Sequence, residues 1–250
     1  MFDGATLVTV AGTFLIAGTV KGVIGLGLPT VSLALLTVAI DLPSAMALIL
    51  APSSVTNLWQ ALAGGNCSVI VRRLWPFLLM ATATVWLGAA ALTRVDLSLL
   101  SALLGLLVVA YAAVNLGGLR FSIAKRHEVW AGALIGSANG VLTGMTGSFL
   151  VPGVMFLQSI GLPRDSLIQA MGMLFTVSTL ALGFALHQGS FLTVQNGALS
   201  LAALVPAIVG MVFGRHVRQR LSEQVFRKVF FVSLLALGTY IMVSALGAFR

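Results

Sequence analysis

The sequence predicts an all-α polytopic membrane protein made of two inverted-topology repeats, each an interrupted, re-entrant-like helical hairpin followed by three transmembrane helices. Three observations support this prediction. Of the 250 residues, 59% are hydrophobic and only 8% are charged, whereas a soluble domain carries roughly 25% charged residues. The apolar residues form long runs between short charged loops. Two glycine-rich interruptions also lie at corresponding points of the two halves of the chain.

The apolar runs define ten segments. Six of them are long enough for a spanning helix, which needs roughly 20 residues. The other four are short and form two pairs, 5–21 with 29–40 and 129–142 with 148–160, each joined by a glycine-rich break. The six longer segments are 44–63, 75–93, 97–118, 166–186, 192–213 and 225–247.

The first break combines residues that a membrane helix normally avoids in its middle. Lys21 is a charge far from either end of the apolar region. Glycine and proline weaken a helix, and irregular backbone at membrane depth is tolerated only where it is buried in protein or lines a cavity. This combination predicts a functional site. The helix-weakening residues are Gly18, Gly22, Gly25, Gly27 and Pro29.

A second copy of this arrangement predicts an internal duplication. Gly18-x-x-x-Gly22-Val-Ile matches Gly136-x-x-x-Gly140-Val-Leu, and Leu42-Pro43 matches Leu162-Pro163. Asn139 is then the near-equivalent of Lys21. We expect residues 1–118 to form the first repeat of a single membrane domain, 119–128 a cytoplasmic linker, and 129–250 the second repeat.

The positive charges predict how the two repeats are oriented. The formal net charge is +8, and its cations gather in loops at 72–73, 120–126 and 215–220. Cytoplasmic loops are rich in Lys and Arg, so we place these three loops inside and the Arg94 and His187 loops outside. Both interrupted regions must then return to their starting side, which inverts the halves. Broken helices in inverted repeats are typical of secondary transporters.

The breaks are expected to bind a small anion. The first amides of a helix have no intrahelical partner and lie at the positive end of its dipole, and glycines let a ligand approach them. The half-helices after the breaks are expected to begin near Leu28 and near Ser148. The substrate-binding residues predicted at the breaks are Lys21, Gly22, Gly25, Gly27 and Pro29 in the first half, and Asn139, Gly140, Thr143, Gly144, Thr146, Gly147 and Ser148 in the second.

Polar residues on the helices after each hairpin form a second candidate set. Asn57, Gln60 and Gln169 are costly to bury, so we expect them to line the substrate route. Hydroxyl groups in membrane helices usually bond to their own backbone. We therefore expect a structural role for most of the others, including Ser53, Thr56, Thr176, Ser178 and Thr179. Structural alternatives exist for the break residues too, because Gly-xxx-Gly often marks a packing face and Lys21 could extend to the membrane surface.

The sequence also argues against several functions. No carboxylate falls in the middle of an apolar segment, so a buried proton relay or an acidic cation site is unsupported. No histidines or cysteines are spaced as metal ligands, Cys67 is the only cysteine, and no nucleotide-binding motif has the right context. A serine protease would require Ser148 to meet His187 at an outer helix end. We predict no enzyme activity, no cofactor, no metal and no nucleic-acid partner.

The break motifs resemble those of the TauE/SafE sulfite exporter family, also called TSUP. The similarity rests on Lys21-Gly-Val-Ile-Gly-Leu-Gly-Leu-Pro29 and on the glycine-rich copy at 136–152, where Met145 and Thr146 replace a richer glycine run. The resemblance implies a multi-pass protein of the bacterial inner membrane that transports sulfite, thiosulfate, sulfoacetate or related anions. It also assigns the motif residues Gly22, Gly25, Gly27, Pro29, Gly140, Gly144, Gly147 and Pro152.

Together these observations predict a secondary transporter of a small sulfur oxyanion or organosulfonate, working by alternating access. The alternatives are an anion channel on the same scaffold or a carrier for a small carboxylate. A membrane enzyme or an assembly partner without flux is a further alternative of a different class. The expected partners are the anion and the lipid bilayer, and the sequence leaves a homo-oligomer open.

Overall fold

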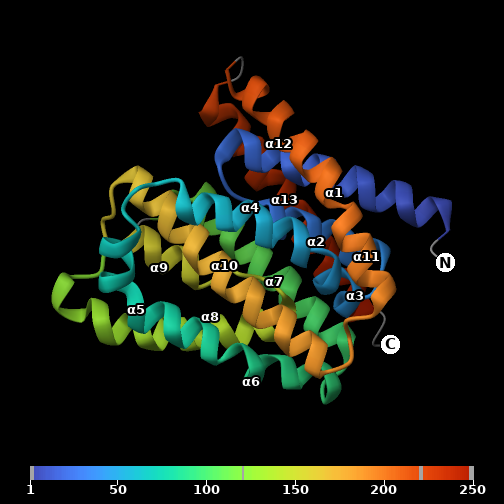
Figure 1. Cartoon of the computed structure of the whole chain (residues 1–250), viewed down its shortest axis with the longest axis horizontal. Coiled ribbons are helices and arrows are strands. Elements are labelled where there is room, and N and C mark those ends of the chain that lie inside the picture. Colours follow the sequence, from blue (N-terminus) through green and yellow to red (C-terminus); the bar gives the residue numbers. More distant parts are fainter. Residues whose placement is uncertain (1–2, 120, 220–221, 248–250) are drawn as a thin grey trace. The chain divides into compact units, whose positions relative to one another are not determined.

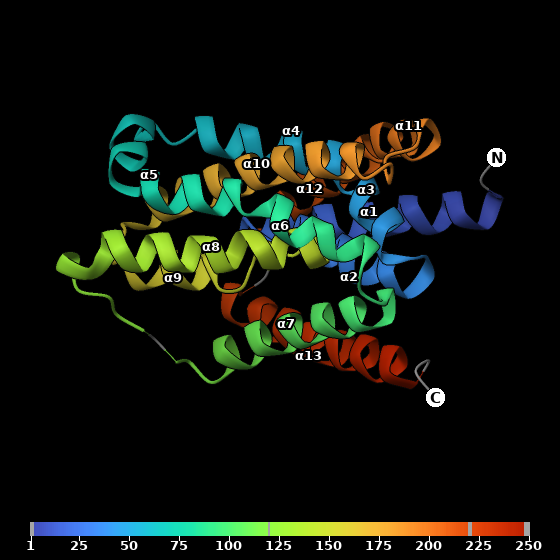
Figure 2. The same ribbon diagram turned by 90° about the horizontal axis from the view of Figure 1, so that it is seen from below.

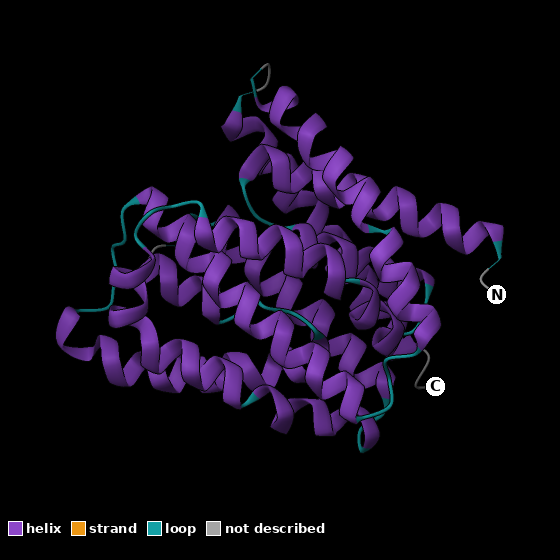
Figure 3. Ribbon diagram, in the orientation of Figure 1, coloured by secondary structure: helices purple, strands orange, loops and turns teal. Residues whose placement is uncertain are grey.

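A computed structural model describes residues 3–119, 121–219 and 222–247 of the chain. The described residues form α-helices and two short 3-10 helices joined by loops, and they contain no β-strand (Figure 3). The all-α prediction is therefore confirmed.

The described residues divide into two compact units. Unit 1 takes its residues from 1–52, 96–118 and 191–250, and unit 2 from 53–95 and 119–190. Each unit thus combines segments from both halves of the sequence. The compact units differ from the predicted repeats, 1–118 and 129–250, because each interrupted hairpin packs against helices of the other half.

Unit 1 is organised around two long helix pairs. α1 packs along α12 (Figure 1), and α7 packs along α13 (Figure 2). α11 packs against α3, and α2 contacts α1 and α13. The helices are α1 (Gly4–Ile24), α2 (Leu28–Ala39), α3 (Leu42–Leu48), α7 (Leu97–Leu116), α11 (Val194–Ala202), α12 (Leu204–Arg218) and α13 (Glu223–Gly247).

Three helices of unit 1 begin at aspartates that the sequence places at segment ends. The side chain of Asp3 accepts a hydrogen bond from the Thr6 amide at 3.0 Å, and Asp41 accepts one from Ser44 at 2.9 Å. Asp96 caps α7 in the same way. Aspartate is a favoured N-cap because it satisfies an amide that has no helical partner. These acids therefore mark helix starts.

Unit 2 is built around α8, which packs on α5 and α6 (Figure 2), while α10 packs on α5, α6 and α9. The first three residues of α4 belong to unit 1 and the rest to unit 2. The elements are α4 (Leu50–Leu62), α5 (Cys67–Ala83), α6 (Val85–Ala89), η1 (Ala90–Thr93), η2 (Lys125–His127), α8 (Glu128–Thr146), α9 (Gly153–Ser159) and α10 (Arg164–Gln188).

Six helical stretches of the described chain are long and apolar enough to cross a membrane. Many large apolar side chains point outward from them, including Leu87 and Phe213. Exposed apolar surface on this scale suits a lipid environment. The stretches are Gly4–Ile24, Cys67–Thr93, Leu97–Leu116, Arg164–Gln188, Val194–Arg218 and Gln224–Gly247.

Several helix boundaries differ from the sequence prediction. The predicted span 44–63 is split at Ile49 into α3 and α4. Arg72 and Arg73 lie inside α5 rather than in a loop, because α5 begins at Cys67, about two turns before the predicted start at residue 75. Arg215 lies in the last turn of α12. Arg120 and Arg220, also assigned to loops, lie outside the described residues.

The second interrupted hairpin also differs from its prediction. The chain was expected to become helical again near Ser148, but α9 begins only at Gly153 and has seven residues. Pro152 explains the delay, because proline disfavours helical backbone at the residue before it and has no N–H to donate. The break therefore extends from Gly147 to Pro152.

Candidate functional site

The first helix break lies within unit 1, between α1 and α2. Gly25 takes a left-handed conformation (φ 79°), and its N–H donates to the Lys21 carbonyl at 2.8 Å. Gly27 is also left-handed (φ 103°), and Pro29 lies in the first turn of α2. Glycine adopts left-handed backbone without strain. The glycines thus end one helix, and proline begins the next.

Lys21 lies in the last turn of α1, one turn before the break, and only 6% of its surface is exposed. A cation at the C-terminal end of a helix is favoured by the helix dipole. A buried amine is nevertheless costly unless polar or charged groups surround it. The structure therefore places a buried lysine beside the first break.

Gly18 and Gly22 allow α1 and α12 to cross closely. A Cβ on Gly22 would overlap the carbonyl oxygen of Met211, and one on Gly214 would overlap that of Thr19. Close backbone approach at small residues is the usual role of Gly-xxx-Gly in membrane helices. Gly22 therefore has a packing partner on α12, which favours the structural interpretation of this residue.

The second break lies within unit 2, and side chains at the break stabilise it by hydrogen bonds to nearby backbone groups. Gly147 is left-handed (φ 73°), and its N–H donates to the Thr143 carbonyl at 2.7 Å. The Thr143 hydroxyl donates to the carbonyl of Ser148 at 3.0 Å. Thr146 donates to Leu142 and accepts from the Ser148 amide. The two threonines predicted to bind substrate thus use their hydroxyls to shape the break.

Asn139 joins the two sides of this break. Its side-chain oxygen accepts a hydrogen bond from the Gly153 amide at 2.9 Å, at the start of α9. A Cβ on Gly153 would touch both the Asn139 side chain and Leu174 of α10. The Gly153 amide, at the start of α9, is therefore occupied by Asn139.

The glycines of α8 pack on α5 and α6 in the same way that α1 packs on α12. A Cβ on Gly140 would overlap the Thr84 side chain and the Ala81 carbonyl, and one on Gly144 would overlap the Val85 carbonyl. These two predicted site residues therefore also contact a neighbouring helix, which favours a packing role.

The two packing patterns define one register between α1 and α8. Gly18 and Gly22 contact Ala207, Met211 and Gly214, whereas Gly140 and Gly144 contact Ala81, Val85 and Gly88. The spacing is identical in both sets.

This register also aligns the helix-ending glycines, Gly25 with Gly147. Lys21 then corresponds to Thr143, whereas the sequence comparison aligned it with Asn139, one turn earlier. α8 has three glycines at four-residue spacing, Gly136, Gly140 and Gly144. A match by sequence alone could therefore slip by one turn.

Gln60 and Gln169 connect α4 to α10. The Gln60 side chain donates to the Ile168 carbonyl at 2.8 Å. Gln169 donates to Ala61 at 2.7 Å and accepts from the Asn66 amide at 3.0 Å. The side-chain amides of both glutamines therefore make hydrogen bonds within unit 2. Asn57 lies one turn before Gln60 on α4 and is fully buried.

Five buried polar atoms of unit 2 have no hydrogen-bond partner among the described residues. Leaving a buried donor unsatisfied costs about 1–3 kcal/mol, so such atoms are rare in folded proteins. The sequence patterns predict substrate binding for Asn139 and Ser148 but a structural role for the other three residues. The feature of the sequence that could have identified these three residues is their position on polar faces of otherwise apolar helices. The atoms are Ser53 Oγ, Asn139 Nδ2, Ser148 Oγ, Ser178 Oγ and Thr179 Oγ1.

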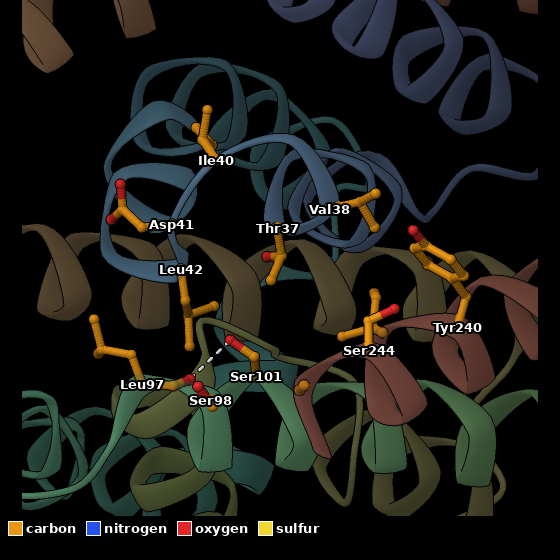
Figure 4. Close-up of a pocket in the computed structure, with 12 residues that line it drawn as sticks. Thr37, Val38, Ile40, Asp41, Leu42, Leu97, Ser98, Ser101, Tyr240 and Ser244 are labelled. Carbon is orange, nitrogen blue, oxygen red and sulfur yellow. Dashed lines mark hydrogen bonds between the residues drawn. The ribbon is translucent and has the colours of Figure 1, made fainter. Parts of the chain in front are cut away.

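Unit 1 contains a separate hollow of about 230 Å³ between the α2–α3 turn, α7 and α13. Figure 4 shows Asp41 and Thr37 on one side, and Tyr240 and Ser244 on another. The Ser101 hydroxyl, also in its wall, donates to the Leu97 carbonyl at 2.8 Å. A carboxylate in the wall disfavours an anion, so this hollow does not match the predicted site.

Charged groups are scarce in the described part of the chain. No three His, Cys, Asp or Glu side chains come together there as a metal site would require. Arg73 pairs with Glu128 at 2.7 Å and also donates to the Ile160 carbonyl. This ion pair ties α5 to the start of α8 and belongs to the scaffold.

Comparison with known families identifies the chain. The model of the sulfite exporter TauE/SafE family matches residues 10–241 of the 250-residue chain. The chain belongs to the TauE/SafE family. No curated protein and no solved structure shows significant similarity to it.

Membership of the TauE/SafE family explains the apolar helices. The family is one of membrane transporters of sulfur anions, and the helical stretches of the described chain are long enough to span a bilayer several times. This TauE/SafE chain is therefore a multi-pass membrane protein. Both helix breaks lie within the family match.

Proposed function

We propose that this TauE/SafE protein is a secondary transporter that moves a small sulfur oxyanion or organosulfonate, such as sulfite, thiosulfate or sulfoacetate, across a bacterial inner membrane. The observation that carries the proposal is the repeated construction of the two breaks in a member of an anion-exporter family. Each break follows a glycine-packed helix that a left-handed glycine ends. Broken helices are where transporters of this general design bind substrates and coupling ions.

The transport cycle is proposed to be alternating access between inverted repeats, 1–118 and 129–250, with 119–128 as a cytoplasmic linker. The equivalent contacts of α1 with α12 and of α8 with α5 and α6 support a duplicated origin. The inverted orientation is supported by the charge distribution of the loops.

The residues around the breaks are assigned roles according to their chemistry. Lys21 supplies positive charge at the first break. At the second, Asn139 and Ser148 are available as donors, while Thr143 and Thr146 hold the backbone in place. Asn57 is proposed to line the route. The hydrogen bonds of Gln60 and Gln169 suit residues that fix the wall of that route.

A thermal-shift screen of the purified protein tests the proposal. A ligand that binds only the folded state raises the melting temperature, and the rise grows with the logarithm of the ligand concentration relative to Kd. Sulfite, thiosulfate, sulfoacetate, taurine, sulfate and a small carboxylate are compared at equal ionic strength. Stabilisation by at least one sulfur anion, and none by chloride, is expected. Equal responses to every salt would contradict a specific anion site.

A further inference from the structure

We propose that unit 2 holds an oxyanion site made of uncharged hydrogen-bond donors, and that this site prefers an anion that carries no proton. The donors are the side-chain amide of Asn139 and the hydroxyls of Ser148, Ser178, Thr179 and Ser53. This inference rests on the proposed anion transport. It adds which residues bind the anion and which charge state they select.

The unsatisfied hydroxyls of α10 differ from other helical hydroxyls in the part of the chain that the structure describes. The Thr176 hydroxyl donates to the Gly172 carbonyl at 2.7 Å, and Ser137 donates to Ala133 at 2.8 Å, as helical hydroxyls usually do. Ser178 and Thr179, on the next turn of α10, have no such bond among the described residues, although they are 0% and 1% exposed. Their geometry leaves them available to a ligand.

Contacts across the break place Asn139 and Ser148 near the same turn of α10. Asn139 bonds to Gly153, which lies against Leu174. The residue after Ser148 is Phe149, whose ring lies 5.9 Å from that of Phe175, centroid to centroid. Both donors therefore lie near the turn of α10 that contains Leu174 and Phe175.

The remaining donors lie about one turn further along. Ser178 and Thr179 follow Phe175 by three and four residues, which is roughly 5 Å along a helix. α4 runs antiparallel to α10, because Gly64 lies against Gln169 while Ala61 lies against Gly172. Continuing this alignment at about 1.5 Å per residue brings Ser53 level with Thr179. The available donors thus cluster around one part of unit 2.

A site made of these donors selects among anions by whether they carry a proton. The Asn139 oxygen is already occupied by the Gly153 amide, so the side chain offers a ligand only its nitrogen, which is a donor. The acids of unit 2 are Glu128, paired with Arg73, and Asp165, exposed at the start of α10. No carboxylate is therefore available to accept a proton from the ligand. A ligand O–H would have to donate to a neutral hydroxyl oxygen, which is a weaker acceptor than a carboxylate. The site therefore disfavours hydrogenphosphate relative to thiosulfate or sulfate.

The experiment measures oxyanion binding to the purified full-length protein by calorimetry at mildly alkaline pH, where thiosulfate carries no proton and phosphate carries one. Thr179→Val and Ser178→Ala remove available hydroxyls. Thr176→Val makes the same change as Thr179→Val on the same helix, at a hydroxyl already bonded to Gly172. We expect Thr179→Val and Ser178→Ala each to weaken thiosulfate binding on the order of tenfold, Thr176→Val to leave it within about twofold, and phosphate to bind at least tenfold more weakly than thiosulfate.

The melting temperature without ligand separates this site from a structural role. Removing an unsatisfied buried hydroxyl should not lower it. A lower melting temperature with unchanged thiosulfate affinity in Thr179→Val and Ser178→Ala would overturn the site, and equal affinity for phosphate would overturn its charge-state preference.

Flux through wild-type protein in proteoliposomes tests the proposed function independently. Transport without any effect of the variants refutes the site alone. Donor-dependent binding without transport refutes the transporter and supports the site.

Discussion

The side-chain oxygen of Asn139 accepts a hydrogen bond from the backbone N–H of Gly153, 2.9 Å away, across the break between α8 and α9. Both residues are buried. One side chain thus fixes the distance between a long helix and the short helix that follows it.

Replacing Asn139 with leucine should destabilise the fold, because it leaves the buried Gly153 amide without its acceptor. We expect the free energy of unfolding to fall by about 1–3 kcal/mol, measured by denaturant titration in detergent. Asn115→Leu is the control, since the Asn115 side chain donates to the Tyr111 carbonyl within its own helix. Equal stability of Asn139→Leu and wild type would show that this bond does not hold the break.

Gly22→Ala and Gly144→Ala should each weaken a helix crossing. The added methyl overlaps the Met211 carbonyl in the first case and the Val85 carbonyl in the second. Overpacking of this kind costs about 1–3 kcal/mol, detectable as a lower melting temperature. Gly12→Ala, also in α1, has open space around it and should be neutral or stabilising. A similar loss in all three variants would contradict the packing role.

We expect the Arg73–Glu128 ion pair to affect the free energy of unfolding differently in a single and a double variant. Glu128 is 7% exposed, and Arg73 also holds the Ile160 carbonyl. Glu128→Gln should lower the free energy of unfolding by an amount on the order of 1–3 kcal/mol, because a charged hydrogen bond is lost. The double variant Arg73→Met with Glu128→Leu should recover part of that loss, since replacing both ions removes the unpaired charge. No recovery would mean that Arg73 acts mainly through Ile160.

Lys21→Ala should abolish binding of the sulfur anion at the first break while the protein remains folded in detergent. The buried cation beside the first break is the charge that the proposed function assigns to the substrate. Calorimetry on the monodisperse variant measures the change, with Lys125→Ala in the short 3-10 helix η2 as the control. Wild-type affinity in Lys21→Ala would remove Lys21 from the binding site.

Much of the fold could be predicted from the sequence. Composition and segment length predicted a helical membrane protein, and glycines located both breaks at Gly25 and Gly147. Helix ends were less predictable. Arg72 and Arg73 were assigned to a loop because they are charged, but they extend α5. Their pairing with a distant partner, Glu128, is a tertiary interaction that no local pattern reveals.

The candidate site was predictable only in part. Sequence patterns identify glycine, but they do not distinguish a glycine that faces a ligand from one that faces another helix, as Gly22 and Gly144 do. Nor do they show which hydroxyls bond to their own helix. Thr176 does so and Thr179 does not, although both lie on α10. Three-dimensional contacts decide both questions.

Substrate exchange in proteoliposomes tests the central claim most directly. Vesicles containing the purified protein are loaded with unlabelled thiosulfate, and uptake of labelled thiosulfate is followed with and without this internal substrate. A carrier with alternating access predicts saturable uptake that internal substrate accelerates. Flux that does not saturate, follows the membrane potential as a current and ignores internal substrate would contradict the carrier and indicate a channel.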